Sequence, residues 1–343
     1  MFHPGRFTGM GLLFSWVFLF AACIPSSRGA GSQFALGTVC TVNAFEKGNP
    51  ELYYLVFSRL RELEDIFSAN KDDTDLDLVN KNAGLAPVRV RPELIAVLEK
   101  AVKFAEKSNG FFDPTVGPLI KLWGIGTDTP RVPGEEEIRK AQELISYKEI
   151  EIDKEGGTVF LKRSGMALDL GAIAKGYAAD DLARFLAGEG VERAIIDLGG
   201  DIFAMGEKPG SDGTYWRIGI QDPKRERGSY FGIVSIKNKS VVTSGTYERF
   251  FEKDGKHYHH IFSIESGFPV ENGLLSVTVV SDECADADAL STAAFALGWE
   301  KGRELIEGVK GAAGVFVFDD LTVRMTEGLE GDFVITAAEY KKP

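Results

Sequence analysis

Met-Ala-Leu-Asp-Leu-Gly-Ala-Ile-Ala-Lys-Gly-Tyr-Ala-Ala-Asp, residues 166–180, is the stretch from which we predict the fold. Apolar residues run up to Asp169 and Leu170, a Gly-Ala pair interrupts them, and a helical pattern then continues to about Leu186. This pattern predicts a strand, a tight turn and a helix. The first N–H groups of a helix have no partner within it, so the turn can bind an anion, with Lys175 one turn further on. The alternative is an ordinary connection with a surface lysine.

The beginning of the chain has the pattern of an export signal rather than of the folded domain. A basic start precedes an apolar run over residues 11–22, which is shorter than the roughly 20 residues of a membrane span and typical of a signal-peptide core. Small residues precede Cys23 and polar residues follow it, which resembles a bacterial lipobox. We expect residues 1–22 to be a lipoprotein signal, Cys23 to carry the lipid and 23–33 to form a tether. The alternative is a secretory signal cut near Ala30.

Composition limits the classes of protein to consider. The 343 residues are 44% hydrophobic and 26% charged, which is ordinary for a globular protein. The formal net charge is −12 and no basic stripe offsets it, so we expect no nucleic-acid partner. We predict one domain over residues 34–343. Cys40 and Cys284 are far apart in sequence, and their spacing leaves open whether they form a disulfide.

Helical and strand patterns are interleaved along this domain. Apolar periodicity predicts helices over 51–67, 92–107, 134–146, 282–297 and 301–308, with a short one inside 110–126. Runs rich in β-branched residues predict strands over 34–45, 191–202, 216–221, 232–237, 240–243, 276–280, 314–318 and 322–325. They also predict a hairpin of 158–162 with 166–170 and another of 247–251 with 257–263. We therefore predict an α+β fold of antiparallel sheets with packed helices. Residues 168–171 and 196–199 share a pattern and suggest an internally duplicated β-α-β unit.

Two oxygen-bearing side chains on one predicted helix point to a metal. Asp288 and Thr292 are four residues apart and therefore share a helical face. A carboxylate and a hydroxyl, with a nearby carbonyl, suit Mg²⁺. The alternative is that Asp286 and Asp288 only complement the positive N-terminus of the helix.

Three of the four histidines fall in one predicted strand. Alternation places His257 and His259 on one face and His260 on the other. No carboxylate or cysteine completes a metal ligand set around the pair, so we predict a catalytic His260. The alternative is a set of solvent-exposed strand histidines.

Seven motifs follow one another along the chain. They are Gly-x-Phe-Asp-Pro-Thr-Val-Gly-Pro-Leu from residue 110, Leu-Asp-Leu-Gly-x-Ile-Ala-Lys-Gly-Tyr-Ala-x-Asp from 168, Asp-Leu-Gly-Gly-Asp from 197, Thr-Ser-Gly-x-Tyr from 243, Tyr-x-His-Ile from 258, Gly-x-Pro from 267 and Ala-Asp-Ala-Leu-Ser-Thr from 287. In this order they resemble the ApbE family of FAD:protein FMN transferases. The resemblance implies an ApbE-like fold and an enzyme that moves FMN from FAD to a Ser or Thr hydroxyl of an exported partner, releasing AMP. It also implies a lipid anchor on the bacterial inner membrane, facing the periplasm.

The resemblance further assigns roles to individual residues. Asp288 and Thr292, with the backbone carbonyl of Ala172, would hold Mg²⁺, and His260 would take the proton from the incoming hydroxyl. The expected contacts to FAD are Leu36, Asn70, Phe111, Phe112, Asp113, Asp169, Lys175 and Phe262.

Asn70 has a second expected role, in catalysis. It stands where most members of the family carry an aromatic residue that can cover the flavin. Asparagine leaves space for water, so we expect the protein to hydrolyse FAD to FMN and AMP as well.

The chain departs from the family pattern near the histidine. After His260 it reads Ile-Phe-Ser-Ile-Glu-Ser-Gly, where the family usually has Ile-x-Asp-Pro-x-Thr-Gly, and Ser291 stands where some members have a second aspartate. Two alternatives to the transferase therefore stay open. One is hydrolysis of FAD alone, and the other is a periplasmic FAD-binding lipoprotein without transferase activity.

Overall fold

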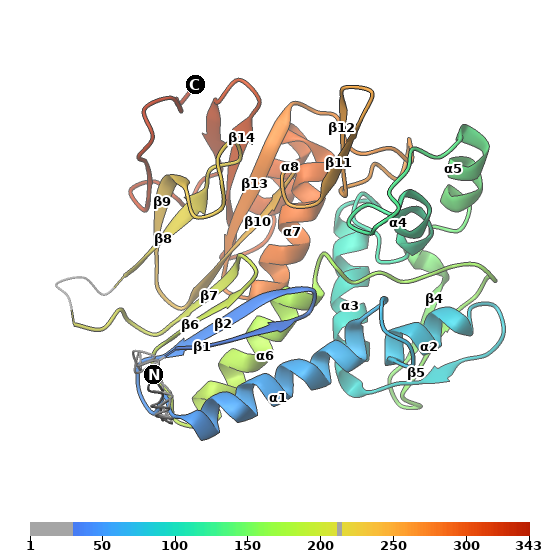
Figure 1. Cartoon of the computed structure of the whole chain (residues 1–343), viewed down its shortest axis with the longest axis horizontal. Coiled ribbons are helices and arrows are strands. Elements are labelled where there is room, and N and C mark those ends of the chain that lie inside the picture. Colours follow the sequence, from blue (N-terminus) through green and yellow to red (C-terminus); the bar gives the residue numbers. More distant parts are fainter. Residues whose placement is uncertain (1–29, 211–214) are drawn as a thin grey trace, which may run out of the picture.

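The computed structural model describes residues 30–210 and 215–343, and an eight-stranded antiparallel sheet crosses its centre (Figure 1). The strands lie in the order β1 (Ala30–Ala35), β2 (Thr38–Ala44), β6 (Ala194–Leu198), β7 (Asp201–Met205), β10 (Lys239–Gly245), β13 (Leu274–Ser281), β14 (Ala313–Phe318) and β15 (Val323–Met325). β13 is buried along nearly its whole length, because both faces of the sheet are covered there.

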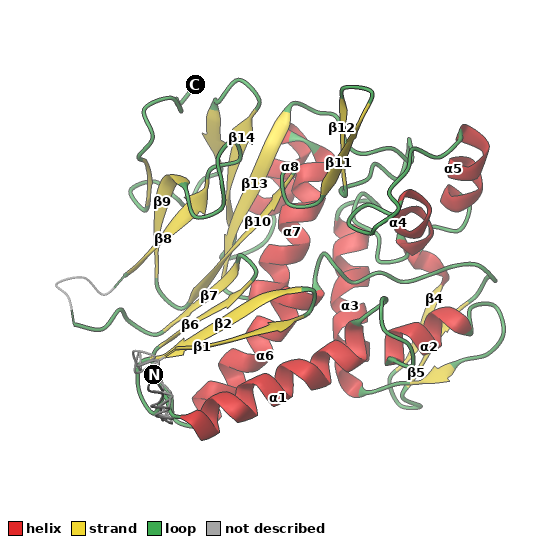
Figure 2. Cartoon of the chain, in the orientation of Figure 1, coloured by secondary structure: helices red, strands yellow, loops and turns green. Residues whose placement is uncertain are grey.

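Eight α-helices are found among the described residues, and several of them cover one face of the sheet (Figure 2). Their bounds are α1 (Pro50–Phe67), α2 (Asp75–Lys81), α3 (Pro92–Lys107), α4 (Gly117–Trp123), α5 (Glu135–Gln142), α6 (Ala174–Gly188), α7 (Cys284–Leu297) and α8 (Trp299–Glu307). The mixed α+β architecture predicted from the sequence is confirmed.

Three small sheets complete the fold. They are β16 (Phe333–Ile335) with β9 (Tyr230–Ile236) and β8 (Trp216–Gln221), β3 (Val88–Arg89) with β5 (Thr158–Leu161) and β4 (Ile150–Asp153), and the hairpin of β11 (Phe250–Lys253) with β12 (Lys256–His259). The first of these packs an apolar face, including Trp216 and Phe231, against Val241 and Val315 of the large sheet. The large sheet therefore has helices on one face and a second sheet on the other.

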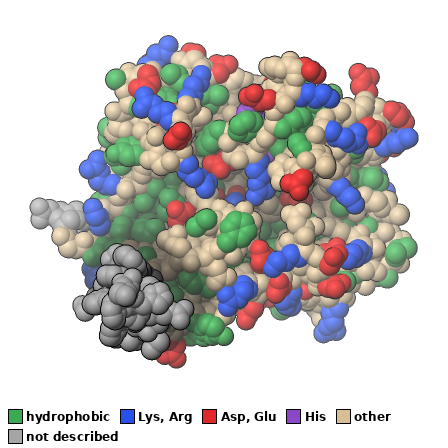
Figure 3. Space-filling view, viewed as in Figure 1, with side chains coloured by type: hydrophobic (Ala, Val, Ile, Leu, Met, Phe, Trp, Pro, Cys, Tyr) green, Lys and Arg blue, Asp and Glu red, His purple; other side chains and the backbone are tan. Residues whose placement is uncertain are grey.

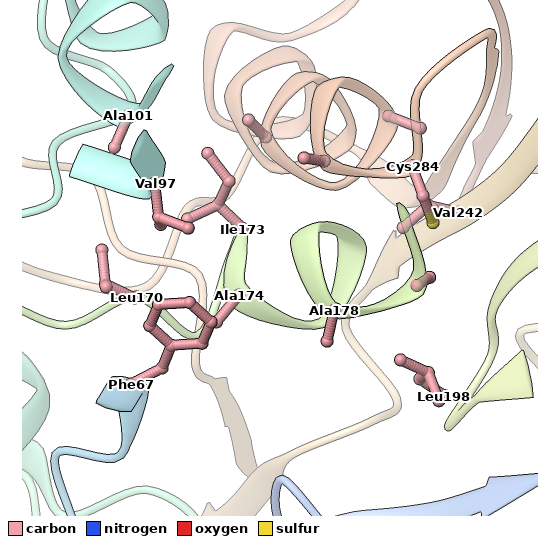
Figure 4. Close-up of a cluster of buried hydrophobic side chains, with 14 of the residues drawn as sticks. Phe67, Val97, Ala101, Leu170, Ile173, Ala174, Ala178, Leu198, Val242 and Cys284 are labelled. Atoms are coloured by element: carbon pink, nitrogen blue, oxygen red, sulfur yellow. The ribbon is translucent and has the colours of Figure 1, made fainter. Parts of the chain in front are cut away.

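α6 and α7 pack closely because small residues line their contact (Figure 4). A Cβ atom on Gly176 would lie 2.4 Å from the carbonyl oxygen of Cys284, so only glycine permits this approach. Asp180 then accepts the backbone N–H groups of Cys284 and Ala285 at 2.7 and 2.9 Å. These two N–H groups belong to the first turn of α7, so α6 satisfies donors that the helix itself leaves unpaired.

The prediction of one long strand over 34–45 is wrong in one respect, because this segment contains the turn of a hairpin. Leu36 and Gly37, with φ values of 52° and 72°, make the two-residue turn between β1 and β2. Residues 30–33 belong to β1 and not to the predicted tether. In the same way 191–202 contains two strands, which turn at Gly199 and Gly200.

The predicted strand over 166–170 is also wrong. Ala167 forms a single bridge with Val116, and the backbone of Leu168 bonds to the side chain of Asn80 at 2.6 and 3.0 Å. Residues 168–171 do not form a strand, whereas most of the matching segment 196–199 belongs to β6. The shared sequence pattern therefore does not support an internally duplicated unit. Helix α2, which the sequence patterns did not predict, provides Asn80.

The described residues contain no helix that is long and apolar enough to cross a membrane. The predicted signal and the lipidated Cys23 lie outside these residues. Cys40 and Cys284 are both buried and free, so they are not joined in a disulfide.

Candidate functional site

A cavity of about 790 Å³ opens where the large sheet, α6, α7 and the loop before α4 meet. Its size is typical of a site for a cofactor-sized ligand. Most of the residues predicted for the site line it: Phe111, Phe112, Asp113, Asp169, Ala172, Lys175, His260, Phe262, Asp288 and Thr292. The fold thus brings together residues that are up to 181 positions apart in the sequence.

A lysine lies between two carboxylates at the base of the cavity. Lys175 Nζ is 2.7 Å from Asp201 Oδ2 and 3.4 Å from Asp288 Oδ2. Burial raises the pKa of Asp288, and the charge of Asp201 raises it further. Burial by itself lowers the pKa of Lys175, but Asp201 and Asp288 outweigh that effect and raise it. When both acids are ionised, the two carboxylates outnumber the one ammonium group and the pocket carries a net negative charge.

At the anion-binding turn predicted before α6, a carboxylate of the protein itself takes the place of a bound anion. The backbone N–H of Gly176 donates to Asp288 Oδ2 at 3.1 Å, and that of Ala174 donates to Leu170 O at 2.8 Å. The carboxylate of Asp288 therefore takes the position beside the helix N-terminus that the sequence pattern suggested for a ligand.

Hydroxyl groups continue the polar wall next to Asp288. Ser244 Oγ lies 2.9 Å from Thr292 Oγ1 and 2.8 Å from Ser291 Oγ, and Ser291 donates to the backbone carbonyl of Asp288 at 2.9 Å. Ala172 also lines the cavity. These are hard oxygen groups, the kind that Mg²⁺ prefers.

A cation fits this site by its donors and its charge. No cluster of three or more His, Cys, Asp or Glu side chains with metal-binding geometry occurs within residues 30–210 and 215–343, so a site rich in carboxylates or histidines is not present there. The donors that line the cavity are the Asp288 carboxylate and the Thr292 hydroxyl, and Ala172 also lines it. Because the pKa of Asp288 is raised by burial and by Asp201, a cation next to it would relieve an existing electrostatic cost.

His260 faces the cavity at the end of β12. Its backbone N–H donates to Arg249 O at 3.1 Å, and its ring Nδ1 lies 3.2 Å from the same oxygen. A hydrogen on Nδ1 makes that contact a hydrogen bond and leaves Nε2 free to accept a proton. Burial lowers the pKa of His260 to about 4, and the charge of Arg249 contributes. The imidazole is therefore neutral at pH 7, as a general base must be.

The two neighbouring histidines have other partners. His259 is buried, with Nε2 2.9 Å from Val270 O, and His257 Nε2 lies 2.9 Å from Thr246 O. Neither of them lines the cavity.

Aromatic and apolar side chains also line the cavity. Phe112 is buried, Phe111 is partly buried, and Phe262 packs against the ring of Trp123 with centroids 5.8 Å apart. Asp113 holds this corner in shape, because its oxygens accept the Thr115 N–H and hydroxyl at 2.8 and 2.6 Å and the Tyr147 N–H at 2.9 Å. A flat aromatic ligand fits such a wall.

Asp169 lines the cavity, where the charge of Arg249 acts on it. Its Oδ1 accepts the N–H of Gly171 at 2.8 Å. Burial raises its pKa, although Gly171 and Arg249 partly oppose the shift.

Comparison with known proteins identifies the family of the chain. Residues 36–316 match the ApbE family. The chain belongs to this family. It is 39% identical to the FAD:protein FMN transferase of Treponema pallidum over 313 residues, which are 87% of this chain and 86% of the relative, and 40% identical to that of Klebsiella pneumoniae (strain 342) over 247 residues, which are 72% and 76% of the two chains.

Solved structures of ApbE proteins have the same fold. The crystal structure of the ApbE protein from Thermotoga maritima superposes with a TM-score of 0.80 at 31% identity, and the flavin transferase ApbE from Vibrio cholerae with a TM-score of 0.78 at 27% identity. Each comparison covers 88% of this chain and 98% of the other. The family resemblance drawn from the motifs is confirmed.

Two residues predicted for the site of this ApbE-family chain do not line the cavity. Leu36 lies in the turn before Gly37, which does line it, and the Leu36 N–H donates to Glu64 Oε1 at 2.9 Å. Asn70 is exposed, and its N–H donates to Ser68 Oγ at 3.1 Å. The predicted roles of Leu36 and Asn70 at the flavin receive no support from this geometry.

Other residues line the cavity without having been predicted for it. Asp197 and Asp201 belong to a motif that was recognised, but neither had been given a role. Arg227 donates to Gly199 O at 3.1 Å and to Glu248 Oε2 at 3.2 Å, and Arg249 also lines the cavity. Elsewhere on the face shown in Figure 3, acidic and basic side chains of the described residues are interspersed.

Proposed function

We propose that this protein is a Mg²⁺-dependent FAD:protein FMN transferase, which moves FMN from FAD to a Ser or Thr hydroxyl of an exported protein and releases AMP. One observation carries the proposal: a neutral histidine, a lysine with a carboxylate, and an aromatic wall share a single cavity in a chain of the ApbE family. A flavin, its pyrophosphate and an incoming hydroxyl need these three kinds of surface. The relatives named above are called FAD:protein FMN transferases.

The residues of the chain would divide the work as follows. His260 Nε2 would take the proton of the acceptor hydroxyl as its oxygen attacks the phosphorus on the FMN side. The bond from that phosphorus to the bridging oxygen would break, and AMP would leave with the electron pair. Lys175 would hold the pyrophosphate by charge, and Phe262 and the Phe111–Phe112 corner would hold the flavin.

A magnesium ion would be held by Asp288, Thr292 and the carbonyl of Ala172. Its chemistry would be the neutralisation of charge on the phosphate oxygens. We further propose that Cys23 carries a lipid and that the protein is anchored to the inner membrane, facing the periplasm.

The test is to incubate the purified chain with FAD and Mg²⁺, with and without an extract of exported proteins. Transfer predicts AMP release together with flavin fluorescence that stays on a protein band in a denaturing gel. AMP and free FMN without an acceptor would indicate hydrolysis instead. FAD binding with no AMP in either arm would mean that the protein only binds FAD.

A further inference from the structure

The Lys175 ammonium is shared unequally between two carboxylates from different elements. Asp201 comes from the first position of β7 and Asp288 from the second turn of α7, and both are at least 96% buried. The Nζ–Oδ2 distance is 2.7 Å to Asp201 and 3.4 Å to Asp288. Asp201 is therefore the closer partner, and Asp288 keeps only a weak contact with the lysine.

The position of Asp201 is fixed by the backbone around it. It pairs with Leu198 across the turn made by Gly199 and Gly200. A Cβ atom on Gly199 would lie 2.2 Å from Thr38 Oγ1, so this turn is held against β2. The backbone of Asp201 is therefore held in place by this turn, and its carboxylate can move only by rotation of the side chain.

A divalent cation bound to Asp288 would repel the ammonium 3.4 Å from the same oxygen. The lysine can give up that contact at small cost, because its charge-assisted hydrogen bond to Asp201 remains. Among the described residues, the ion pairs of Lys175 are those with Asp201 and Asp288, so loss of Asp201 would leave the lysine paired with Asp288.

We propose that Lys175 is the counter-ion of Asp288 in the metal-free protein, and that Asp201 retains the lysine when a divalent cation takes Asp288. Asp201 is then a positioning residue, which acts on the metal through Lys175 and not as a ligand. The inference rests on the metal site of the proposed function.

The experiment measures Mn²⁺ binding to the full chain by electron paramagnetic resonance, in the absence of FAD. Lys175→Met should raise the affinity by about fivefold or more, the size of a coupling of ~1 kcal/mol between neighbouring residues. Asp201→Asn should lower it by about fivefold or more in the wild-type background. In the Lys175→Met background, Asp201→Asn should change it by less than about twofold.

Lys100→Met is the matched control. Lys100 pairs with Asp286 and Glu283 at the start of the same helix but does not line the cavity, so its loss should leave the affinity within about twofold. Circular dichroism and thermal midpoints establish that each variant is folded. Should Asp201→Asn not fold, Lys175→Met decides the question alone.

Three results would overturn the inference. An equal loss of affinity on Asp201→Asn in both backgrounds would make Asp201 a ligand. Unchanged or lower affinity in Lys175→Met would show that the lysine does not compete with the metal. Wild-type protein that binds no Mn²⁺ would remove the metal site from the proposed function as well, whereas the first two results would leave that function standing.

Discussion

His260 is the side chain on which the proposed proton transfer depends. His260→Ala should lower FMN transfer by roughly 10²–10⁴-fold, the usual effect of losing a general base. FAD affinity should stay near that of the wild type, because the aromatic wall and Lys175 are untouched. Transfer rates and FAD titrations check this. His257→Ala is the control, since His257 does not line the cavity; equal losses in both variants would remove His260 from the mechanism.

The lowered pKa of His260 predicts the direction in which the stability of the fold changes with pH. Between pH 6.5 and about 4 the unfolded chain binds a proton on this histidine and the folded chain does not, so His260 makes folding less favourable as the pH falls through that window. His260→Gln removes the effect. The thermal midpoint of the variant should therefore rise relative to that of the wild type as the pH is lowered from 7 to 5. A difference that stays constant with pH would mean that His260 titrates normally.

Asp288 tests the two explanations that the sequence left open for the acids of α7. Asp288→Ala should abolish Mg²⁺-dependent turnover and leave the fold largely intact, because burial already disfavours this charge. Asp286→Ala should keep most of the turnover, since Asp286 pairs with Lys100 outside the cavity. AMP release at matched Mg²⁺ and circular dichroism are the measurements. Comparable losses in both variants would favour a role at the helix N-terminus instead.

At the level of elements, the contact between α6 and α7 sets the geometry of the site. Gly176→Ala would force its Cβ into the carbonyl of Cys284, so the helices must separate. We expect a loss of about 1–3 kcal/mol in the free energy of unfolding, as in other overpacked cores, and weaker Mn²⁺ binding. Gly188→Ala in the same helix is the control, because a Cβ there meets no other atom within 4 Å. Denaturant unfolding of both variants would show whether the loss in the free energy of unfolding comes from the close packing of the two helices or from helix propensity.

Elements with strong local signals were predicted correctly from the sequence. α1 and α3 begin with proline and have a clear apolar face, and the Asn49 side chain caps α1 at 2.8 Å. A hairpin was predicted where β11 and β12 lie, and Asp254-Gly255 forms its two-residue turn. The turn at Leu36 was missed because leucine rarely adopts a positive φ. The strand expected over 166–170 was wrong because Asn80, a distant residue, bonds to this backbone.

For the candidate site, too, some features were predicted from the sequence and others were not. Lys175, His260 and Asp288, which the family motifs singled out, all line one cavity, since each motif carries its own residue. The partners of these residues were beyond the sequence patterns. That Arg249 O would lie against His260, or that Asp201 would hold Lys175, depends on how distant strands and helices pack.

For the whole molecule, the proposed lipid on Cys23 predicts that the protein is held at the membrane. Cys23→Ser should give an exported protein that is recovered in the soluble fraction, because a lipidated cysteine with several acyl chains anchors firmly and an unlipidated chain does not. Fractionation of cells that express each form, with blotting, is the measurement. Recovery of the variant in the membrane fraction at the level of the wild type would contradict the anchor.

The early start of β1 has a mechanical consequence for a tethered enzyme. β1 begins at Ala30, and the turn after it brings Gly37 and Thr38 to the cavity wall. If Cys23 carries the lipid, seven residue steps separate it from the start of β1, so the tether is at most about 25 Å long. The enzyme would then reach only a thin layer above the bilayer. Proteins embedded in that same surface would meet it at a high effective concentration, whereas freely diffusing ones would seldom enter the layer.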